Sequence, residues 1–370
     1  MSKEEEIFDI FPAKEDIPEA YFFDEIIDQD FFLVNGELRK WQGEQQQVYS
    51  PVFMKTKGES YSVLIGKYPL MDEETAMTAL KSAEESFDKG RGQWATMKIK
   101  DRINYLIDFL NRFQNKKDEL VKLLMWEIGK PEQESIKEFN RTVSNISDTI
   151  EELKRMNCDS SEFNTEENIV AQIRRTPLGV VLCMGPFNFP LNETFATLIP
   201  ALMMGNSIVF KPPKHGVLLH EPLIKLFKEC FPKGVINTIY GRGEEVVAPI
   251  LKSGKVNVLA FIGSSQVANI LRAYHPKPNR LTEVYGLEAK NPGIVLEDAD
   301  LDYSVNECFT GALTFNGQRC TALKILFVHS SLIDKFLEKL SKKIDDVRFG
   351  MPWEKDVMIT PLPESAKVEY

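Results

Sequence analysis

The chain has 370 residues, a length that predicts two or three domains, and 43% of them are apolar, enough for a packed core. Charged residues make up 27%, close to the globular norm, so the composition excludes a disordered chain. The net charge of −10 argues against nucleic acids and anionic membranes as partners, although it leaves open a local basic pocket for a small anion.

Cysteine and histidine usage bears on compartment and metal content. The five cysteines are scattered, odd in number and never spaced as CxxC, and the four histidines lack metal-ligand spacing. We therefore expect no disulfide framework, no metal site and a reducing, cytoplasmic location. The acidic residues 1–6 lack the features of a signal peptide, and no apolar run reaches the length of a membrane span.

The first part of the chain is predicted to be mainly helical after an irregular start. Residues 1–50 predict a surface extension with a short hairpin at Asn35-Gly36. Apolar spacing then predicts four helices, the third of which ends at the stop signal Gly129-Lys130-Pro131, over residues 72–87, 100–115, 117–128 and 134–156. Residues 159–177 are polar apart from an alternating run at 169–173, which predicts a protruding β-arm.

Short apolar strands and helices alternate between residues 179 and 287. The strands are expected at 179–183, 207–210, 235–240, 256–262 and 281–287, and the helices at 191–204, 216–230, 244–252 and 265–274. This alternation predicts an α/β fold with a parallel, Rossmann-like sheet. Ligands bind such sheets at the carboxyl ends of the strands. A second unit, with two helices and one strand, follows the acidic run at 298–302.

Polar turns follow the first two predicted strands. Asn188 lies in Gly185-Pro186-Phe187-Asn188-Phe189-Pro190, where two prolines fix the turn. Its amide could donate a hydrogen bond to a developing oxyanion, or the turn could merely cap the next helix. Lys211 and Lys214 follow the second strand, where they could bind ribose hydroxyls or phosphate, or be two ordinary solvated lysines.

Glycines follow the third and fourth strands, in Gly241-Arg242-Gly243 and Gly263-Ser264. They would let the backbone approach a cofactor, and the helix N-terminus after Gly263 could accept a phosphate. No GxGxxG fingerprint follows the first strand, so an ordinary Rossmann dehydrogenase is not supported.

Cys320 is the candidate nucleophile, in the run Asn-Gly-Gln-Arg-Cys-Thr of residues 316–321. A lone cysteine is commonly a small core residue. Here the polar neighbours near a helix start favour an exposed, reactive thiolate.

Together these motifs resemble the aldehyde dehydrogenase superfamily from about residue 35 to 363. They are Gly129-Lys130-Pro131, 185–190, Lys211-Pro212, 261–264, 298–302 and 317–320, in the family's order and spacing. The resemblance implies that the Cys320 thiolate attacks an aldehyde and that Asn188 and the Cys320 backbone N–H hold the oxyanion. Hydride would then pass to a nicotinamide, and water would hydrolyse the thioester. Further cofactor contacts are implied for Met184, Pro186, Phe187, Lys211, Lys214, Gly243, Gly263 and Ser264.

Within the superfamily the chain is most similar to the NADP-dependent, non-phosphorylating glyceraldehyde-3-phosphate dehydrogenases. That similarity implies that Arg141 and Arg319 bind the substrate phosphate, through bidentate contacts. NAD-preferring relatives carry a glutamate at the position of Lys214, so this lysine favours NADP, with NAD possible. The group's tyrosine after the catalytic asparagine is replaced by Phe189, which removes one hydroxyl donor.

The family's general base is displaced in this chain. The family pattern is Glu-Leu-Gly-Gly-Lys, and alignment on Lys290 places Gly286 at the glutamate's position, with Glu288 two residues later. Either a backbone shift lets Glu288 activate water, or Glu288 is an ordinary surface or cofactor-side residue. CoA-acylating semialdehyde dehydrogenases also lack this glutamate, which leaves that activity as an alternative. Thr321-Ala322 and Pro292 favour the hydrolytic group.

The resemblance also implies a division into domains. Residues 1–158 and 178–287 would form the cofactor-binding domain, 159–177 an oligomerisation β-arm, and 288–370 part of the catalytic domain. Family members continue well past residue 370, so we expect a C-terminally incomplete chain that belongs to a homo-oligomer when full length. A catalytically silent truncated subunit is a further alternative.

Overall fold

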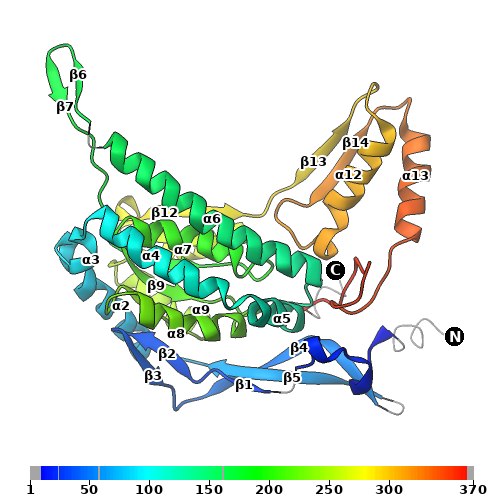
Figure 1. The fold of residues 1–370 in the computed structure, drawn as a ribbon, viewed down its shortest axis with the longest axis horizontal. Coiled ribbons are helices and arrows are strands. Elements are labelled where there is room, and N and C mark those ends of the chain that lie inside the picture. The colour runs from blue at the N-terminus through cyan, green and yellow to red at the C-terminus, as the bar shows by residue number, and fades with distance from the viewer. Residues whose placement is uncertain (1–9, 24, 57–58, 161, 365–370) are drawn as a thin grey trace.

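A parallel sheet of five strands, in the order β10-β9-β8-β11-β12, forms the centre of the molecule (Figure 1). The computed structural model describes residues 10–23, 25–56, 59–160 and 162–364. The strands are β8 (Val180–Met184), β9 (Ser207–Lys211), β10 (Ile236–Thr238), β11 (Val258–Gly263) and β12 (Thr282–Leu287). Val180 to Cys183 and Ser207 to Phe210 are buried without interruption, because both faces of the inner strands are covered. The predicted parallel α/β sheet is therefore confirmed.

Helices surround this sheet, and most lie where apolar spacing predicted them. Helix α2 begins at an N-cap in which the Asp72 carboxylate accepts the Thr75 N–H, and its buried alanines pack against the sheet. The helices are α2 (Glu73–Phe87), α3 (Gln93–Thr96), α4 (Ile99–Gln114), α5 (Lys117–Ile128), α6 (Glu132–Asp159), α7 (Asn192–Met203), α8 (Glu221–Cys230), α9 (Gly243–Val246), α10 (Ala248–Lys252) and α11 (Ser265–Tyr274).

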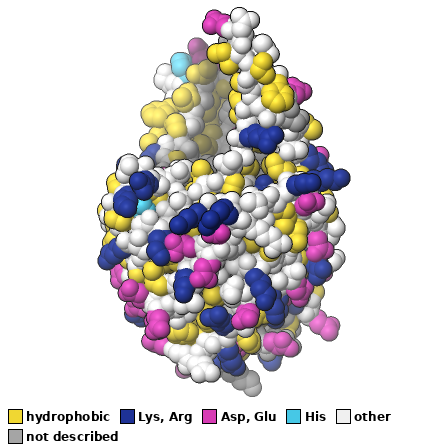
Figure 2. Space-filling model, turned by 90° about the vertical axis from the view of Figure 1, so that its left-hand side faces the viewer, with side chains coloured by type: hydrophobic (Ala, Val, Ile, Leu, Met, Phe, Trp, Pro, Cys, Tyr) yellow, Lys and Arg dark blue, Asp and Glu magenta, His cyan; other side chains and the backbone are white. Residues whose placement is uncertain are grey.

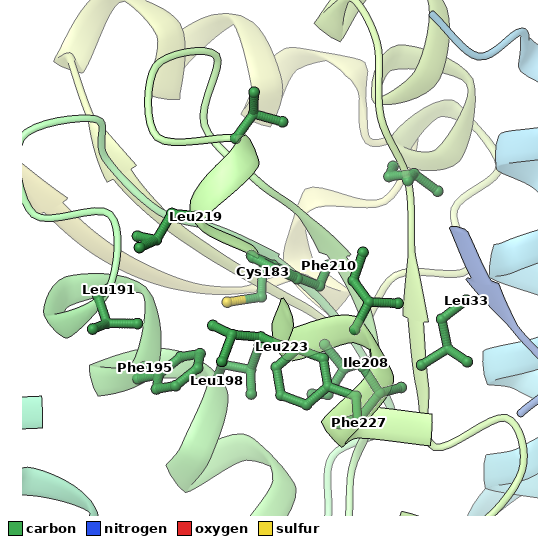
Figure 3. Packing of buried hydrophobic residues seen from close by; sticks show 14 of the residues in the cluster. Leu33, Cys183, Leu191, Phe195, Leu198, Ile208, Phe210, Leu219, Leu223 and Phe227 are labelled. Carbon is green, nitrogen blue, oxygen red and sulfur yellow. The ribbon is translucent and has the colours of Figure 1, made fainter. Parts of the chain in front are cut away.

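The main core lies between the sheet and helices α7 and α8 (Figure 3). Cys183 of β8 and Phe210 of β9 point into it, and they meet Leu198 of α7 and Phe227 of α8. Aromatic rings carry much of this packing, as Phe109 of α4 stacks on Phe227 with centroids 5.5 Å apart.

The N-terminal segment corrects one prediction. The hairpin at Asn35-Gly36 is present, as β2 (Phe31–Val34) and β3 (Glu37–Lys40), and both turn residues have positive φ. Residues 31–34 are nevertheless not a surface extension, because Leu33 is buried and its N–H donates to Thr238 Oγ1 of β10 at 2.8 Å. Residues 1–9 lie outside the described part of the chain.

A long antiparallel hairpin was not predicted. Strands β4 (Gln45–Thr56) and β5 (Glu59–Pro69) pair with two register shifts, and β1 (Ile27–Asp28) adds to β5. The polar run of glutamines at 45–47 and the register shifts break the alternation by which a strand is recognised.

Two segments project from this body (Figure 1). The β-arm is a hairpin of β6 (Asn164–Glu166) and β7 (Ile169–Ala171), within the range expected. The second lobe contains α12 (Leu301–Leu313), α13 (Ile333–Asp345) and the parallel pair β13 (Asn291–Val295) and β14 (Leu323–Val328). Strand β13 was not predicted, because Pro292 and Gly293 interrupt its apolar pattern and both disfavour a strand. This lobe has a small apolar cluster of its own, whose members are Val295, Val305, Cys308 and Phe336.

Candidate active site

Asn188 and the Cys320 loop come from different lobes and meet. The Asn188 side-chain amide donates a 2.6 Å hydrogen bond to the carbonyl oxygen of Gln318, two residues before Cys320. Asn188 lies in the turn between β8 and α7, and Cys320 is exposed in the loop that leads into β14. The structure therefore brings the two predicted catalytic residues into one site.

The backbone before Cys320 is strained. Phe315, Asn316 and Gly317 all have positive φ, which costs free energy for the two residues with a Cβ. Asn316 compensates with a pair of bonds to the backbone of Thr360, at 2.8 and 3.0 Å. Such strain is retained where the surroundings fix a loop in one conformation.

The other side of the same loop is held by two donors from the second lobe. Asn291 donates to the carbonyl oxygens of Cys320 at 2.6 Å and Ala322 at 3.1 Å. The Lys324 ammonium donates to the carbonyl oxygens of Arg319 at 3.2 Å and Ala322 at 3.0 Å. Burial and the nearby charge of Lys290 lower the pKa of Lys324. The loop around Cys320 is thus fixed by its carbonyls, while the thiol remains exposed.

A fully buried ion pair supports the Asn188 turn from beneath. Lys130 is 0% exposed, forms an ion pair with Glu138, and donates to the Asn188 carbonyl oxygen at 3.0 Å. Glu138 accepts the N–H groups of Leu191 and Asn192, each at 3.0 Å, at the start of α7. Burial lowers the pKa of Lys130, and the Glu138 carboxylate opposes this effect.

Aromatic rings from both lobes enclose the same ammonium. The Lys130 Nζ lies 3.5 Å from the ring centroid of Phe189 and 4.7 Å from that of Phe315. Both contacts are within cation–π range, and desolvation strengthens them. Phe189 therefore packs on Lys130.

The predicted cofactor residues lie at the carboxyl edge of the sheet. Met184 ends β8 and is in register with Lys211, which ends β9. Lys211 is half-buried and donates only to the Pro212 carbonyl oxygen, at 3.3 Å, among the described residues. Burial lowers the pKa of its ammonium to about 8. A half-buried cation with no carboxylate partner among the described residues suits an anionic or hydroxyl-bearing ligand.

The surrounding turns leave room for such a ligand. Pro186 and Phe187 are half-buried, and the Phe187 ring lies edge-on to His215, with centroids 6.2 Å apart. Lys214 is exposed. A Cβ added at Gly243, the first residue of α9, would meet nothing within 4 Å. No protein contact requires a glycine there, which agrees with close approach of a ligand.

The Glu288 carboxylate is hydrogen-bonded to Ser265, whereas a free general base would have an unengaged carboxylate. Its carboxylate accepts the Ser265 N–H at 2.7 Å and the Ser265 hydroxyl at 2.6 Å, at the start of α11. These bonds lower the pKa of Glu288. Ser264 is the N-cap, and its hydroxyl accepts the Val267 N–H. Glu288 and the predicted phosphate site at Gly263 and Ser264 therefore share one helix terminus, and the role of Glu288 as base stays a prediction.

The two arginines predicted to bind phosphate are not brought together by any contact in the described part of the chain. Arg141 is exposed on α6. Arg319 directs its Nη2 to the carbonyl oxygens of Thr310 at 3.3 Å and Gly311 at 3.0 Å, at the end of α12. Its Nε is buried without a partner. Their role as phosphate ligands also stays a prediction.

Sequence reasoning missed Lys130, Glu138, Asn291 and Lys324. Lys130 was noted only as part of Gly129-Lys130-Pro131, a helix stop signal and family motif, and that run did not indicate a buried cation. Nothing in the local pattern marked the other three. Within the described ranges, no cluster of His, Cys, Asp and Glu could hold a metal ion, and no helix has the length and apolarity to cross a membrane.

The chain belongs to the aldehyde dehydrogenase family, whose sequence pattern matches residues 44–370. It is 32% identical over 342 residues to an NADP-dependent glyceraldehyde-3-phosphate dehydrogenase of Streptococcus equinus, covering 91% of this chain and 68% of that protein. It is 31% identical to a lactaldehyde dehydrogenase of Methanocaldococcus jannaschii, covering 83% of this chain and 65% of the other. A malonate-semialdehyde dehydrogenase of Bacillus subtilis subsp. natto is 29% identical, and the match covers 89% of this chain and 65% of that protein.

A solved structure agrees with this assignment. The NADP complex of NADP-dependent glyceraldehyde-3-phosphate dehydrogenase from Bacillus halodurans superposes with a TM-score of 0.83 at 27% identity, covering 92% of this chain and 70% of that one. An aldehyde dehydrogenase of Bacillus cereus in complex with NAD+ superposes with a TM-score of 0.82 at 27% identity, covering 94% and 68%. The chain thus spans about two thirds of the length of the relatives it matches.

Proposed function

We propose that the whole protein oxidises glyceraldehyde 3-phosphate to 3-phosphoglycerate with NADP, through a thioester on Cys320. The contact between Asn188 and Gln318 carries this proposal, because it holds an amide donor beside the nucleophile loop. The Cys320 thiolate would attack the aldehyde carbon. One Asn188 N–H is bonded to Gln318, and the second, with the Cys320 backbone N–H, would stabilise the oxyanion.

The residues at the sheet edge fit a nicotinamide dinucleotide. The ammonium of Lys211 has no carboxylate partner among the described residues, and the space beside Gly243 is open. Lys211 would bind the adenosine ribose and Lys214 the 2′-phosphate, with Met184, Pro186, Phe187, Gly263 and Ser264 completing the cradle. When bound, the cofactor supplies the hydride acceptor. The relatives' names support NADP, while NAD remains the second candidate.

The assignment of glyceraldehyde 3-phosphate as substrate rests on the names of the relatives and on two arginines, Arg141 and Arg319. Arg319 uses Nη2 for the end of α12, so its Nη1 would be the group offered to a phosphate. Arg141 would supply the second guanidinium from α6. Several relatives act on glyceraldehyde 3-phosphate by name, and others on lactaldehyde or malonate semialdehyde.

A CoA-acylating semialdehyde dehydrogenase is the second candidate. The observation that favours it is the pair of hydrogen bonds from Ser265 to Glu288, which occupies the carboxylate that was predicted to activate water. If Glu288 does not activate water, the thioester would need another acyl acceptor, and a thiol such as CoA is one.

The domain division is proposed on the same basis. The cluster of Val295, Val305, Cys308 and Phe336 is separate from the main core, which supports a cofactor-binding domain over 1–158 and 178–287 and part of a catalytic domain over 288–370. Phe315, Met351 and Trp353 of the last range pack in the main core and would join the two domains. The arm, 159–177, would pack against a second copy, because Ile169, Val170 and Ile173 are each about two-thirds exposed.

Product analysis tests the function. The protein is incubated with glyceraldehyde 3-phosphate and NADP, with and without CoA, and NADPH and acyl products are measured. Formation of 3-phosphoglycerate without CoA supports the proposal. Formation of product only with CoA replaces it by the second candidate. If a Cys320→Ser variant produces NADPH at the same rate, the covalent route is wrong.

A further inference from the structure

A cavity of about 430 Å³ lies at the far end of α6 from the candidate active site. It opens between the start of α4, the end of α6 and the base of the β-arm. Residues of all three segments line it, among them Lys98, Lys100, Leu153, Met156 and Arg174. The volume is within the range of pockets for small organic ligands. From Glu138 to Met156, α6 advances about 27 Å, so the cavity is well removed from the Asn188 turn.

The rim of the cavity is positive in a protein of net charge −10. Four of the lining residues are Lys or Arg, and none of them is acidic. Figure 2, which faces this side of the molecule, shows Lys and Arg side chains gathered across its middle, below the arm. The charge of Arg175 is partly balanced by Glu152. The hydrogen bond from Arg155 lowers the pKa of the Glu152 carboxyl most, and the charge of Arg175 lowers it further. Lys98 and Lys100 have no ion-pair partner among the described residues.

Arg174 is held in place by a relay from the end of α6. The Arg174 Nε donates to Gln172 Oε1 at 3.1 Å, and Gln172 Nε2 donates to the Ser160 carbonyl oxygen at 3.0 Å. These bonds leave both Nη groups without a partner in the described ranges. A guanidinium fixed through Nε offers its two Nη donors to a tetrahedral oxyanion at little entropic cost.

The start of α4 adds backbone donors to the same rim. No side chain caps this 16-residue helix at Lys98. The N–H groups of Asp101 and Arg102 bond to the Lys98 carbonyl oxygen, while those of Ile99 and Lys100 bond to nothing described. A helix terminus with unsatisfied N–H groups favours an anion.

The floor of the cavity is apolar. Leu153 is buried, and Ile99, Met156 and Met204 are half-buried around it. An apolar floor under a cationic rim distinguishes this cavity from an exposed patch of lysines, since it can bury the carbon skeleton of a ligand while the rim pairs with its charge.

We propose that this cavity binds a small phosphate monoester with an apolar or aromatic part, at a site separate from catalysis. The phosphate would lie on Arg174, Lys98 and Lys100 and on the free N–H groups of α4. The apolar part would lie on Leu153 and Met156. A bound ligand would link α4, α6 and the residues that begin and end the β-arm, and so fix the arm's direction.

Titration calorimetry of the whole protein tests the site, with phenyl phosphate as the probe and inorganic phosphate and phenol as comparators. We expect phenyl phosphate to bind with a Kd below about 1 mM and more tightly than either comparator. Arg174→Gln and the double variant Lys98→Gln/Lys100→Gln should each weaken binding about tenfold or more. The matched control is Lys335→Gln/Lys342→Gln, which removes the same charge from α13 and should leave the Kd unchanged.

Four results would overturn the proposal. These are no binding of phenyl phosphate by the wild type, equal affinity for inorganic phosphate, equal losses in the rim and control variants, and loss of binding at saturating NADP. The last result would assign the probe to the cofactor edge instead. All the substituted residues are exposed, so the variants retain the fold and their affinities are comparable.

Discussion

Asn188 and Gln318 are 130 positions apart in sequence, and a single 2.6 Å hydrogen bond between the Asn188 amide and the Gln318 carbonyl joins them. This bond connects the two lobes of the molecule at the candidate site. It joins the turn after β8 to the loop that carries Cys320. The position of the amide depends in turn on Lys130, which donates to the Asn188 backbone from below.

Replacement of Asn188 by alanine should lower kcat about 10²- to 10³-fold with little change in KM, because an oxyanion donor acts mainly in the transition state. Steady-state kinetics with the proposed substrate measure this. Asn269→Ala, an exposed asparagine on α11, is the control and should leave kcat unchanged. A matching rise in KM for Asn188→Ala would indicate substrate binding rather than transition-state stabilisation.

Lys130→Met should destabilise the fold by about 3–5 kcal/mol, because it leaves the buried Glu138 carboxylate without its cation. Lys130→Met/Glu138→Gln removes both charges and should recover part of the loss. Lys154→Met breaks an exposed pair with Glu151 and should cost about 0–1 kcal/mol. Denaturant unfolding measures all three, and equal values for Lys130→Met and Lys154→Met would contradict the structural role of the buried pair.

NADP binding should weaken as pH rises through about 8, because burial lowers the pKa of Lys211 to about 8 and the neutral amine loses its attraction for the cofactor. Lys211→Met should bind NADP weakly at every pH, and its affinity should not change as pH passes 8.

The contribution of Lys211 to folding stability should change with pH in the opposite direction to NADP binding. Between pH 8 and the unfolded pKa of about 10.4, the unfolded chain binds more protons, so the contribution of Lys211 to stability rises with pH. Fluorescence titration of NADP across pH checks the first effect.

Thiol reagents should modify two of the five cysteines, Cys158 and Cys320, because only these are exposed. Burial raises the pKa of Cys183 and of Cys230 to about 12, and it also raises that of Cys308, so these three should remain unreacted in the native protein. Mass mapping after timed alkylation measures each site. A catalytic Cys320 should react faster than Cys158, and equal rates would favour a catalytically silent chain.

Glu288→Gln should slow steady-state turnover while leaving the first burst of NADPH intact, if Glu288 activates the deacylating water. Ser265→Ala is the informative partner variant, because it removes one of the two donors that hold the Glu288 carboxylate. We expect Ser265→Ala to raise the deacylation rate or leave it unchanged. Turnover in Glu288→Gln equal to the wild type would exclude Glu288 as the base and favour an external acyl acceptor.

The sequence was sufficient for the parts of the fold that repeat a simple period. Apolar runs located β8, β9 and β11, and helical apolar spacing located α2. Elements whose pattern was broken could not be recognised. The register shifts near Tyr49 interrupt the alternating pattern of β4, and Pro292 and Gly293 interrupt that of β13.

The residues of the candidate site also fall into those that could be predicted from local sequence and those that could not. Asn188, Cys320 and Lys211 follow strands or stand in distinctive runs, so their positions could be predicted. Their supports could not be predicted, because Lys130 contacts Asn188, Phe189 and Phe315, which are far away in sequence. The engagement of Glu288 by Ser265 is likewise a tertiary contact that no local pattern indicates.

The separate apolar cluster of the second lobe has a consequence for how the molecule opens. Four buried side chains hold α12, α13 and β13 together, whereas the sheet shares a far larger core with its helices. The lobe that carries Cys320 is therefore the unit expected to exchange its amide hydrogens first, by sub-global opening, while the amides around Asn188 stay protected. We therefore expect the two halves of the candidate site to differ in local free energy of opening, with Cys320, the candidate nucleophile, in the less protected half.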